Sequence, residues 1–194
     1  MSDRLEVLIR ELTPDLLPDY LDYFDHDAFV EHPEWAKCYC YFYFAPHHLK
    51  DWEERTADEN RLAVSQLIQN REMHGYLAYT NDRVVGWCNA NPRRSFLSLS
   101  DENEPLADQI GSIVCFNVLP AYRGQGVATQ LLHAACTGFT RQGLEIAEAY
   151  PRNDTLSSTS NYHGPLSMYL SAGFERFREL GEFTIVRKKL IPTD

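Results

Sequence analysis

Short runs of apolar residues, bounded by turn-forming residues, recur along the chain and predict a β-sheet. Two of these boundaries, Asn81-Asp82 and Gly181, have the composition of tight turns, and each joins two expected strands. The expected strands are residues 5–9, 76–80, 84–90, 111–119, 144–150, 175–179 and 183–189.

Apolar residues at helical spacing between these strands predict four helices. Thr13 followed by proline is typical of a helix start, with the threonine as cap. Thr56 and Glu59 have the spacing of a capping box. The expected helices begin at Thr13, Thr56, Gln125 and Pro165, the second reaching about Glu72 and the third ending at Gly143; the polar stretches 91–109 and 152–161 are expected to be loops.

The chain has 194 residues and shows neither an internal repeat nor a low-complexity linker. It is long enough to bury a sizeable core, and we expect residues 1–194 to form one domain. The predicted element order is β–α–α–β–β–β–α–β–α–β–β.

Composition narrows the class of protein. Hydrophobic residues make up 44% of the chain and charged residues 24%, as in an ordinary globular protein. The formal charge of −10 disfavours nucleic acid as a partner and is compatible with a cationic amine substrate, although surface acidity can serve solubility alone. The apolar runs are too short to span a bilayer, and the first residues lack the pattern of a signal peptide. We therefore expect a cytoplasmic protein with no membrane partner, and no structural disulfide among five cysteines.

The segment from Val118 to Leu132 combines the end of a buried strand, a glycine-rich turn and the start of an amphipathic helix. This arrangement directs free backbone N–H groups and the positive end of a helix dipole toward one point, which favours phosphate. Gly124 and Gly126 leave the backbone accessible, and Arg123 adds a fixed positive charge. The sequence thus predicts an anion site here.

Three phosphate sites share this outline. A nucleoside-triphosphate loop requires a lysine that the turn lacks. A dinucleotide site of the Gly-x-Gly-x-x-Gly type fits Gly124 and Gly126, with Thr129 at the third position and Glu148 about where the acidic residue is expected. Five residues separate the strand from Gly124, which is unusual for that site, but the dinucleotide alternative stays open.

The third possibility fits best. Arg123-Gly124-Gln125-Gly126-Val127-Ala128, after a hydrophobic strand and Pro-x-Tyr, resembles the acetyl-coenzyme A motif of the GNAT superfamily of N-acetyltransferases. Residues 165–174 resemble the late helix of that family, with Tyr169 a few residues before Gly-Phe. The resemblance implies an α/β fold: a GNAT-like mixed β-sheet of about seven strands, flanked by helices on both faces.

The resemblance also implies a cofactor site for acetyl-coenzyme A. The backbone around Asn117 and Val118 would hold the acetyl carbonyl. Amides of the turn and of the first helical residues would hold the pyrophosphate: Arg123, Gly124, Gln125, Gly126, Val127, Ala128 and Thr129.

Two residues are candidates for proton transfer. Tyr169 matches the family tyrosine that protonates the departing thiolate, the alternative being a core tyrosine whose hydroxyl bonds to backbone. Glu148 is the best carboxylate candidate for the general base, against a solvent-facing residue at the sheet edge or a water relay. Cys115 raises a covalent acetyl-enzyme as an alternative, although buried strand cysteines are usually inert.

The aromatic run from Trp35 to Phe44 precedes two histidines. A zinc site is not expected, because the Cys-x-Cys spacing is poor. Trp35, Tyr39 and Tyr41 are expected to line the acceptor pocket, since aromatic faces suit a cationic amine.

The chain is thus expected to be an N-acetyltransferase that uses acetyl-coenzyme A, no metal, and direct attack by an amine in a ternary complex. We expect a small-molecule amine, with a peptide N-terminus or a lysine side chain as other acceptors. A non-catalytic acyl-coenzyme A binding or sensor protein is the alternative from another class. A homodimer through sheet-edge pairing is left open.

Overall fold

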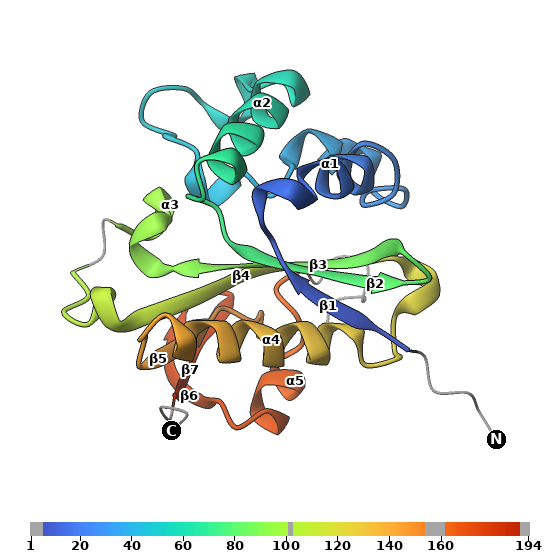
Figure 1. The fold of residues 1–194 in the computed structure, drawn as a ribbon. Coiled ribbons are helices and arrows are strands. Elements are labelled where there is room, and N and C mark those ends of the chain that lie inside the picture. Colours follow the sequence, from blue (N-terminus) through green and yellow to red (C-terminus); the bar gives the residue numbers. More distant parts are fainter. Residues whose placement is uncertain (1–5, 101–102, 154–161, 191–194) are drawn as a thin grey trace.

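The computed structural model describes residues 6–100, 103–153 and 162–190, and they contain one seven-stranded mixed sheet (Figure 1). The strand order is β1-β2-β3-β4-β5-β7-β6, and every neighbouring pair is antiparallel except β4 and β5. The strands are β1 (Leu8–Glu11), β2 (Gly75–Thr80), β3 (Arg83–Pro92), β4 (Ile110–Val118), β5 (Ile146–Ala149), β6 (Glu175–Leu180) and β7 (Phe183–Lys189).

Helices cover both faces of this sheet (Figure 1). α1 (Leu17–His26) and α2 (Ala57–Gln69) lie on one face, and α4 (Val127–Arg141) and α5 (Leu166–Ser171) lie on the other. The one-turn α3 (Leu97–Ser100) follows β3. The expected mixed sheet with flanking helices is confirmed.

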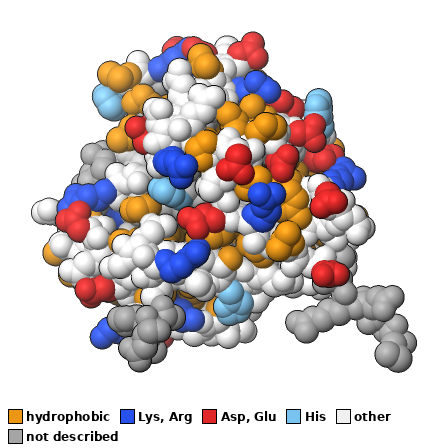
Figure 2. Space-filling model, viewed as in Figure 1, with side chains coloured by type: hydrophobic (Ala, Val, Ile, Leu, Met, Phe, Trp, Pro, Cys, Tyr) orange, Lys and Arg blue, Asp and Glu red, His pale blue; other side chains and the backbone are white. Residues whose placement is uncertain are grey.

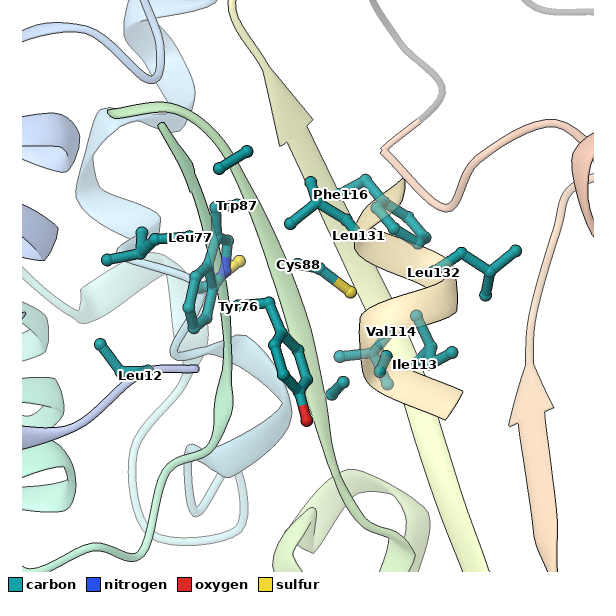
Figure 3. Close-up of a cluster of buried hydrophobic side chains, with 14 of the residues drawn as sticks. Leu12, Tyr76, Leu77, Trp87, Cys88, Ile113, Val114, Phe116, Leu131 and Leu132 are labelled. Carbon is teal, nitrogen blue, oxygen red and sulfur yellow. The ribbon is translucent and has the colours of Figure 1, made fainter. Parts of the chain in front are cut away.

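The core is built from alternate residues of the central strands (Figure 3). Trp87 faces the α1 side, where its ring packs edge-on against Tyr20 at 5.0 Å. Tyr76 faces α4, which approaches so closely that a side chain at Gly138 would collide with the Tyr76 hydroxyl. Close-packed side chains on both faces fix the central strands relative to the helices.

β4 and β5 separate in the middle of the sheet, and this position matters for the site. Their parallel pairing ends at Ile113 and Ala149, whereas β4 continues to Val118. The Phe116 N–H donates instead to the Tyr162 carbonyl at 2.6 Å. Because backbone groups alternate along a strand, the Val118 N–H also points toward this opening.

Local sequence chemistry explains some elements better than others. The capping box at Thr56 and Glu59 is present and opens α2. Thr13, by contrast, does not cap the backbone; its hydroxyl donates to the Asp15 carboxylate, and a 3-10 turn precedes α1. The expected loop 91–109 is partly wrong, since it contains α3 and two 3-10 turns, Arg93–Ser95 and Ala107–Gln109. The expected loop 152–161 lies mostly outside the described residues.

Acidic and basic side chains are interspersed with apolar ones on the face drawn in Figure 2, so the net charge does not form one patch there. Within the described ranges, every helix is too short or too polar to cross a membrane.

Candidate functional site

A cleft of about 1110 Å³ opens where β4 leaves β5. One wall is the glycine turn before α4 and the first residues of that helix. The opposite wall is the segment from Ala28 to Glu53, and the floor is the free end of β4, with the Tyr162–Pro165 stretch beside it. The cleft therefore connects the glycine turn with a chamber beside residues 28–53.

The turn before α4 has the backbone that an anion site requires. Gly124 and Gly126 adopt φ values of +71° and +82°, a region that other residues enter only with strain. Nothing lies within 4 Å of where their side chains would project, so the turn is open on that side. Gly126 starts α4 without a side-chain cap, which leaves the first-turn N–H groups for a ligand.

Arg123 connects the two walls of the cleft. Its Nε donates to the Val118 carbonyl at 2.9 Å, and its Nη1 lies 2.5 Å from the Glu31 carboxylate. Glu31 belongs to the opposite wall. The arginine charge is thus held beside the turn while it ties the segment after α1 to the end of β4.

The chamber beyond the turn is walled by aromatic rings and thiols. Trp35, Phe42, Tyr43 and Trp52 line it, and Cys38, Cys40 and Cys115 lie among them. Burial raises the pKa of the Cys38 thiol to about 12. The pKa of Cys115 is also well above its usual range, because of a hydrogen bond with Cys40 and then burial. These two thiols are neutral at physiological pH.

A model of the acetyltransferase (GNAT) family matches residues 35–163, well over half of the chain. The chain belongs to this family. Its members are acyltransferases, and the matched region contains the turn, the free end of β4 and most of the chamber wall. No curated protein sequence matches the chain significantly.

Solved GNAT structures share the whole fold. PaiA N-acetyltransferase from Thermoplasma acidophilum, solved with coenzyme A, is 14% identical over 95% of this chain and 99% of its own, with a TM-score of 0.57. A GNAT acetyltransferase from Listeria monocytogenes 4b F2365 is 16% identical over 98% of both chains, with a TM-score of 0.62. The Salmonella typhimurium protein yncA, solved with its cofactor acetyl-CoA, is 17% identical over 96% and 95%, with a TM-score of 0.56. At these identities the likeness establishes the fold.

Most residues expected at the GNAT cofactor site lie on the cleft. Gln125 is the exception: it does not line the cleft, and its side chain donates to the Ala121 carbonyl. The side chain of Asn117 is committed to α1, since it accepts from the Tyr23 hydroxyl and donates to the Ala28 carbonyl. Its backbone carbonyl also accepts from the Tyr23 hydroxyl, and by the same alternation its N–H faces β3, so the neighbouring Val118 N–H is the group left for a ligand. The residues that line the cleft are Asn117, Val118, Arg123, Gly124, Gly126, Val127, Ala128 and Thr129.

Tyr169 is fully buried, and its hydroxyl donates to the His163 carbonyl at 2.6 Å. Burial holds its pKa well above the usual range, so the proton is retained. The ring lies directly behind Gly164, which does line the cleft; a side chain at Gly164 would come within 3.4 Å of the hydroxyl. Tyr169 itself does not line the cleft, and its hydroxyl bonds to backbone as in the core-tyrosine alternative, with Gly164 lying between the ring and the cleft.

Glu148 does not line the cleft, which argues against its role as general base. It is fully buried in β5, so the solvent-facing alternative is also wrong. Its carboxylate accepts from Arg93 at 2.5 Å, from Arg187 at 2.6 Å and from the Tyr150 hydroxyl. The contact between Arg93 and Glu148 could not be predicted from the sequence, because a polar loop residue is usually solvated.

Trp35 lines the cleft, whereas Tyr39 and Tyr41 do not. Left-handed backbone at Tyr39 turns its side chain toward α1, where the hydroxyl donates to Asp25. The Tyr41 ring packs under Arg55 instead, at 4.9 Å. Phe42, Tyr43 and Trp52 take their places, and nothing in the alternation of the sequence distinguishes them, because the segment is a series of 3-10 turns.

His32 also lines the cleft, although no motif or spacing in the sequence singles it out. Its ring stacks on Trp35 with 4.1 Å between centroids, and its Nδ1 lies 3.0 Å from the Glu34 carboxylate. The described residues include no group of three His, Cys, Asp or Glu side chains placed to hold a metal ion.

Proposed function

We propose that this protein is an N-acetyltransferase that moves the acetyl group of acetyl-coenzyme A to an amine by direct attack in a ternary complex. The observation that carries the proposal is the shared cleft. An anion-binding turn, an unpaired strand end and an aromatic chamber open onto one another in the order in which a nucleotide, its pantetheine arm and an acceptor would bind.

The cofactor would bind through backbone. The pyrophosphate would accept from amides between Arg123 and Thr129, where α4 adds its dipole. The acetyl carbonyl would lie at the β4 opening, polarised by N–H groups near Asn117 and Val118. In support, coenzyme A is bound in the T. acidophilum PaiA structure and acetyl-CoA in the yncA structure.

Tyr169 would donate the proton to the departing thiolate. Its raised pKa means that the hydroxyl is protonated at physiological pH, and only Gly164 lies between the ring and the cleft. In this reaction the amine nitrogen bonds the acetyl carbon and loses a proton to a base, the carbon–sulfur bond breaks, and the thiolate takes the tyrosine proton, which solvent later replaces. The neutral state of Cys115 favours direct attack over an acetyl-cysteine intermediate, because a thiol must lose its proton to be a nucleophile.

We propose a small primary amine with a flat apolar body as acceptor. Trp35, Phe42 and Trp52 offer ring faces for such a body and for its cationic group before deprotonation. Among the acidic residues of the cleft, Glu31 and Glu53 are paired with Arg123 and Lys37, and Glu34 is the one whose negative charge would attract an ammonium ion.

The test is calorimetric titration of the protein with acetyl-coenzyme A and with NAD, followed by release of free thiol in the presence of primary amines. We expect binding of acetyl-coenzyme A alone and amine-dependent thiol release. Binding without thiol release for any amine would indicate a sensor protein, and binding of NAD alone would indicate a dinucleotide enzyme.

A further inference from the structure

We propose that His32 is the general base that takes the proton of the attacking amine, with Glu34 as the positioning residue that orients its ring. The inference rests on the proposed function and assigns the base that Glu148 does not supply.

Two chains of contact connect the segment around His32 to the free end of β4. On one side, the neighbouring Glu31 pairs with Arg123, which donates to the Val118 carbonyl. On the other side, the His32 ring stacks on Trp35, and the Trp35 ring packs against Tyr162 at 6.0 Å. Tyr162 in turn binds Phe116 of β4 through its carbonyl. Both routes lead to the opening where the thioester would lie.

The hydrogen bond to Glu34 assigns the tautomer of the ring. A hydrogen bond from its own backbone N–H, and then one from His32, lower the pKa of Glu34, so it is a carboxylate and only accepts. Nδ1 of His32 therefore carries the proton, and in the neutral ring Nε2 keeps the lone pair.

The Nε2 atom has no hydrogen-bond partner among the described residues and is shielded from bulk solvent. A buried polar atom without a partner costs free energy, which a ligand's N–H group would recover. His32 is a cleft-lining residue, so an amine in the cleft could supply the missing donor, and a basic nitrogen that lacks a donor is what amine deprotonation needs.

The other ionisable groups around His32 are less suited to the task. Glu31 is paired with Arg123, and Glu53 with Lys37. Burial raises the pKa values of Tyr43 and Tyr162, which keeps both as phenols. Glu34 is ionised but largely exposed and already accepts from His32.

In the proposed step the amine nitrogen bonds the acetyl carbon while its proton passes to Nε2 of His32. The carbon–sulfur bond then breaks, and Tyr169 protonates the thiolate. The imidazolium releases its proton to solvent as product leaves, so the net products are the amide and coenzyme A thiol.

The test compares His32→Gln with His26→Gln in the full chain. His26 is an exposed histidine on α1, so its variant controls for the chemical change alone. Probes are acetyl-coenzyme A with 2-phenylethylamine, n-hexylamine and lysine amide. For His32→Gln we expect kcat/KM to fall by about a hundredfold or more, with acetyl-coenzyme A affinity within about twofold by calorimetry. The acidic limb of the kcat/KM–pH profile should disappear, and added imidazole should restore activity to His32→Ala.

Each outcome separates this inference from the proposed function. An active wild type whose rate and pH profile survive His32→Gln would overturn the role of His32 and leave the acetyltransferase intact. Loss of acetyl-coenzyme A affinity in that variant would also overturn it, since the histidine would then serve binding or structure. A wild type that binds acetyl-coenzyme A but acetylates no amine would overturn both. Glu34→Gln should lower kcat by severalfold and shift the pH profile, which a purely structural contact would not do.

Discussion

The two halves of the cleft differ in what they present to a ligand: backbone groups in one and side chains in the other. The half proposed to hold the cofactor, from Val118 to Thr129, presents backbone amides whose direction is set by two left-handed glycines and the start of α4. The acceptor half, from Ala28 to Glu53, presents side chains on a series of 3-10 turns. Backbone recognition suits a ligand part that never varies, whereas side chains on turns can change without disturbing the sheet. The comparison predicts that substitutions in the two halves will have separable effects.

The largest expected effect is on the pH dependence of stability, through His163, which lies between the cleft-lining residues Tyr162 and Gly164. This residue is buried, and burial, followed by the charge of Arg152, lowers its pKa to about 4. The unfolded chain therefore binds a proton between its ordinary pKa near 6.5 and pH 4 that the folded protein refuses. Stability is lost as pH falls through that window, by at most about 3 kcal/mol. We expect the unfolding free energy of wild type, relative to His163→Gln, to decrease by that order between pH 7 and 4 in urea melts.

His26→Gln is the control for this measurement, because it makes the same chemical change at an exposed position on α1. A constant difference in unfolding free energy between wild type and His163→Gln across this pH window would show that the folded protein also protonates the His163 ring.

The proposed catalytic role of Tyr169, whose hydroxyl donates to the His163 carbonyl, is tested by Tyr169→Phe. We expect kcat to fall by about a hundredfold with little change in acetyl-coenzyme A affinity, because only the proton donor is lost. Tyr20→Phe is the matched control: it is equally buried and also loses a hydroxyl that donates to a backbone carbonyl, that of Tyr39, at 2.7 Å. Both variants should lose about 1 kcal/mol of stability, but only Tyr169→Phe should slow turnover. Unchanged turnover would leave Tyr169 a core residue.

The two halves of the cleft also differ in how well the sequence predicts them. The seven strands and the turn at Gly124 and Gly126 could be predicted, because apolar alternation and positive-φ glycines are local properties. Tyr39 and Tyr41 could not be placed, since a left-handed backbone at a non-glycine residue has no local signature. The surroundings of Glu148 could not be predicted for a related reason: its partners are Arg93, just after β3, and Arg187, opposite it on β7, and only the folded sheet brings them together.

The cofactor half is tested alone by Gly126→Asp. A side chain at φ +82° is strained, and its negative charge would face the pyrophosphate, so we expect acetyl-coenzyme A affinity to fall by about tenfold or more. Gly143→Asp places the same side chain at φ +79°, also in open space, at the other end of α4. Calorimetry should separate a shared loss of stability from a loss of affinity confined to Gly126→Asp. Equal affinities in the two variants would place the phosphates elsewhere.

The acceptor half should give the smallest and most specific effect. Trp35→Ala removes a ring face from the cleft wall, and we expect KM for 2-phenylethylamine to rise by about fivefold, within the range for one lost cation–π contact. Tyr41→Ala removes a neighbouring aromatic that faces Arg55, so its KM should match wild type. Acetyl-coenzyme A affinity should be unchanged in both, because neither ring touches the glycine turn. If Trp35→Ala weakened acetyl-coenzyme A as much as the amine, the two halves would form one binding surface, and acceptor choice could not change independently of the cofactor.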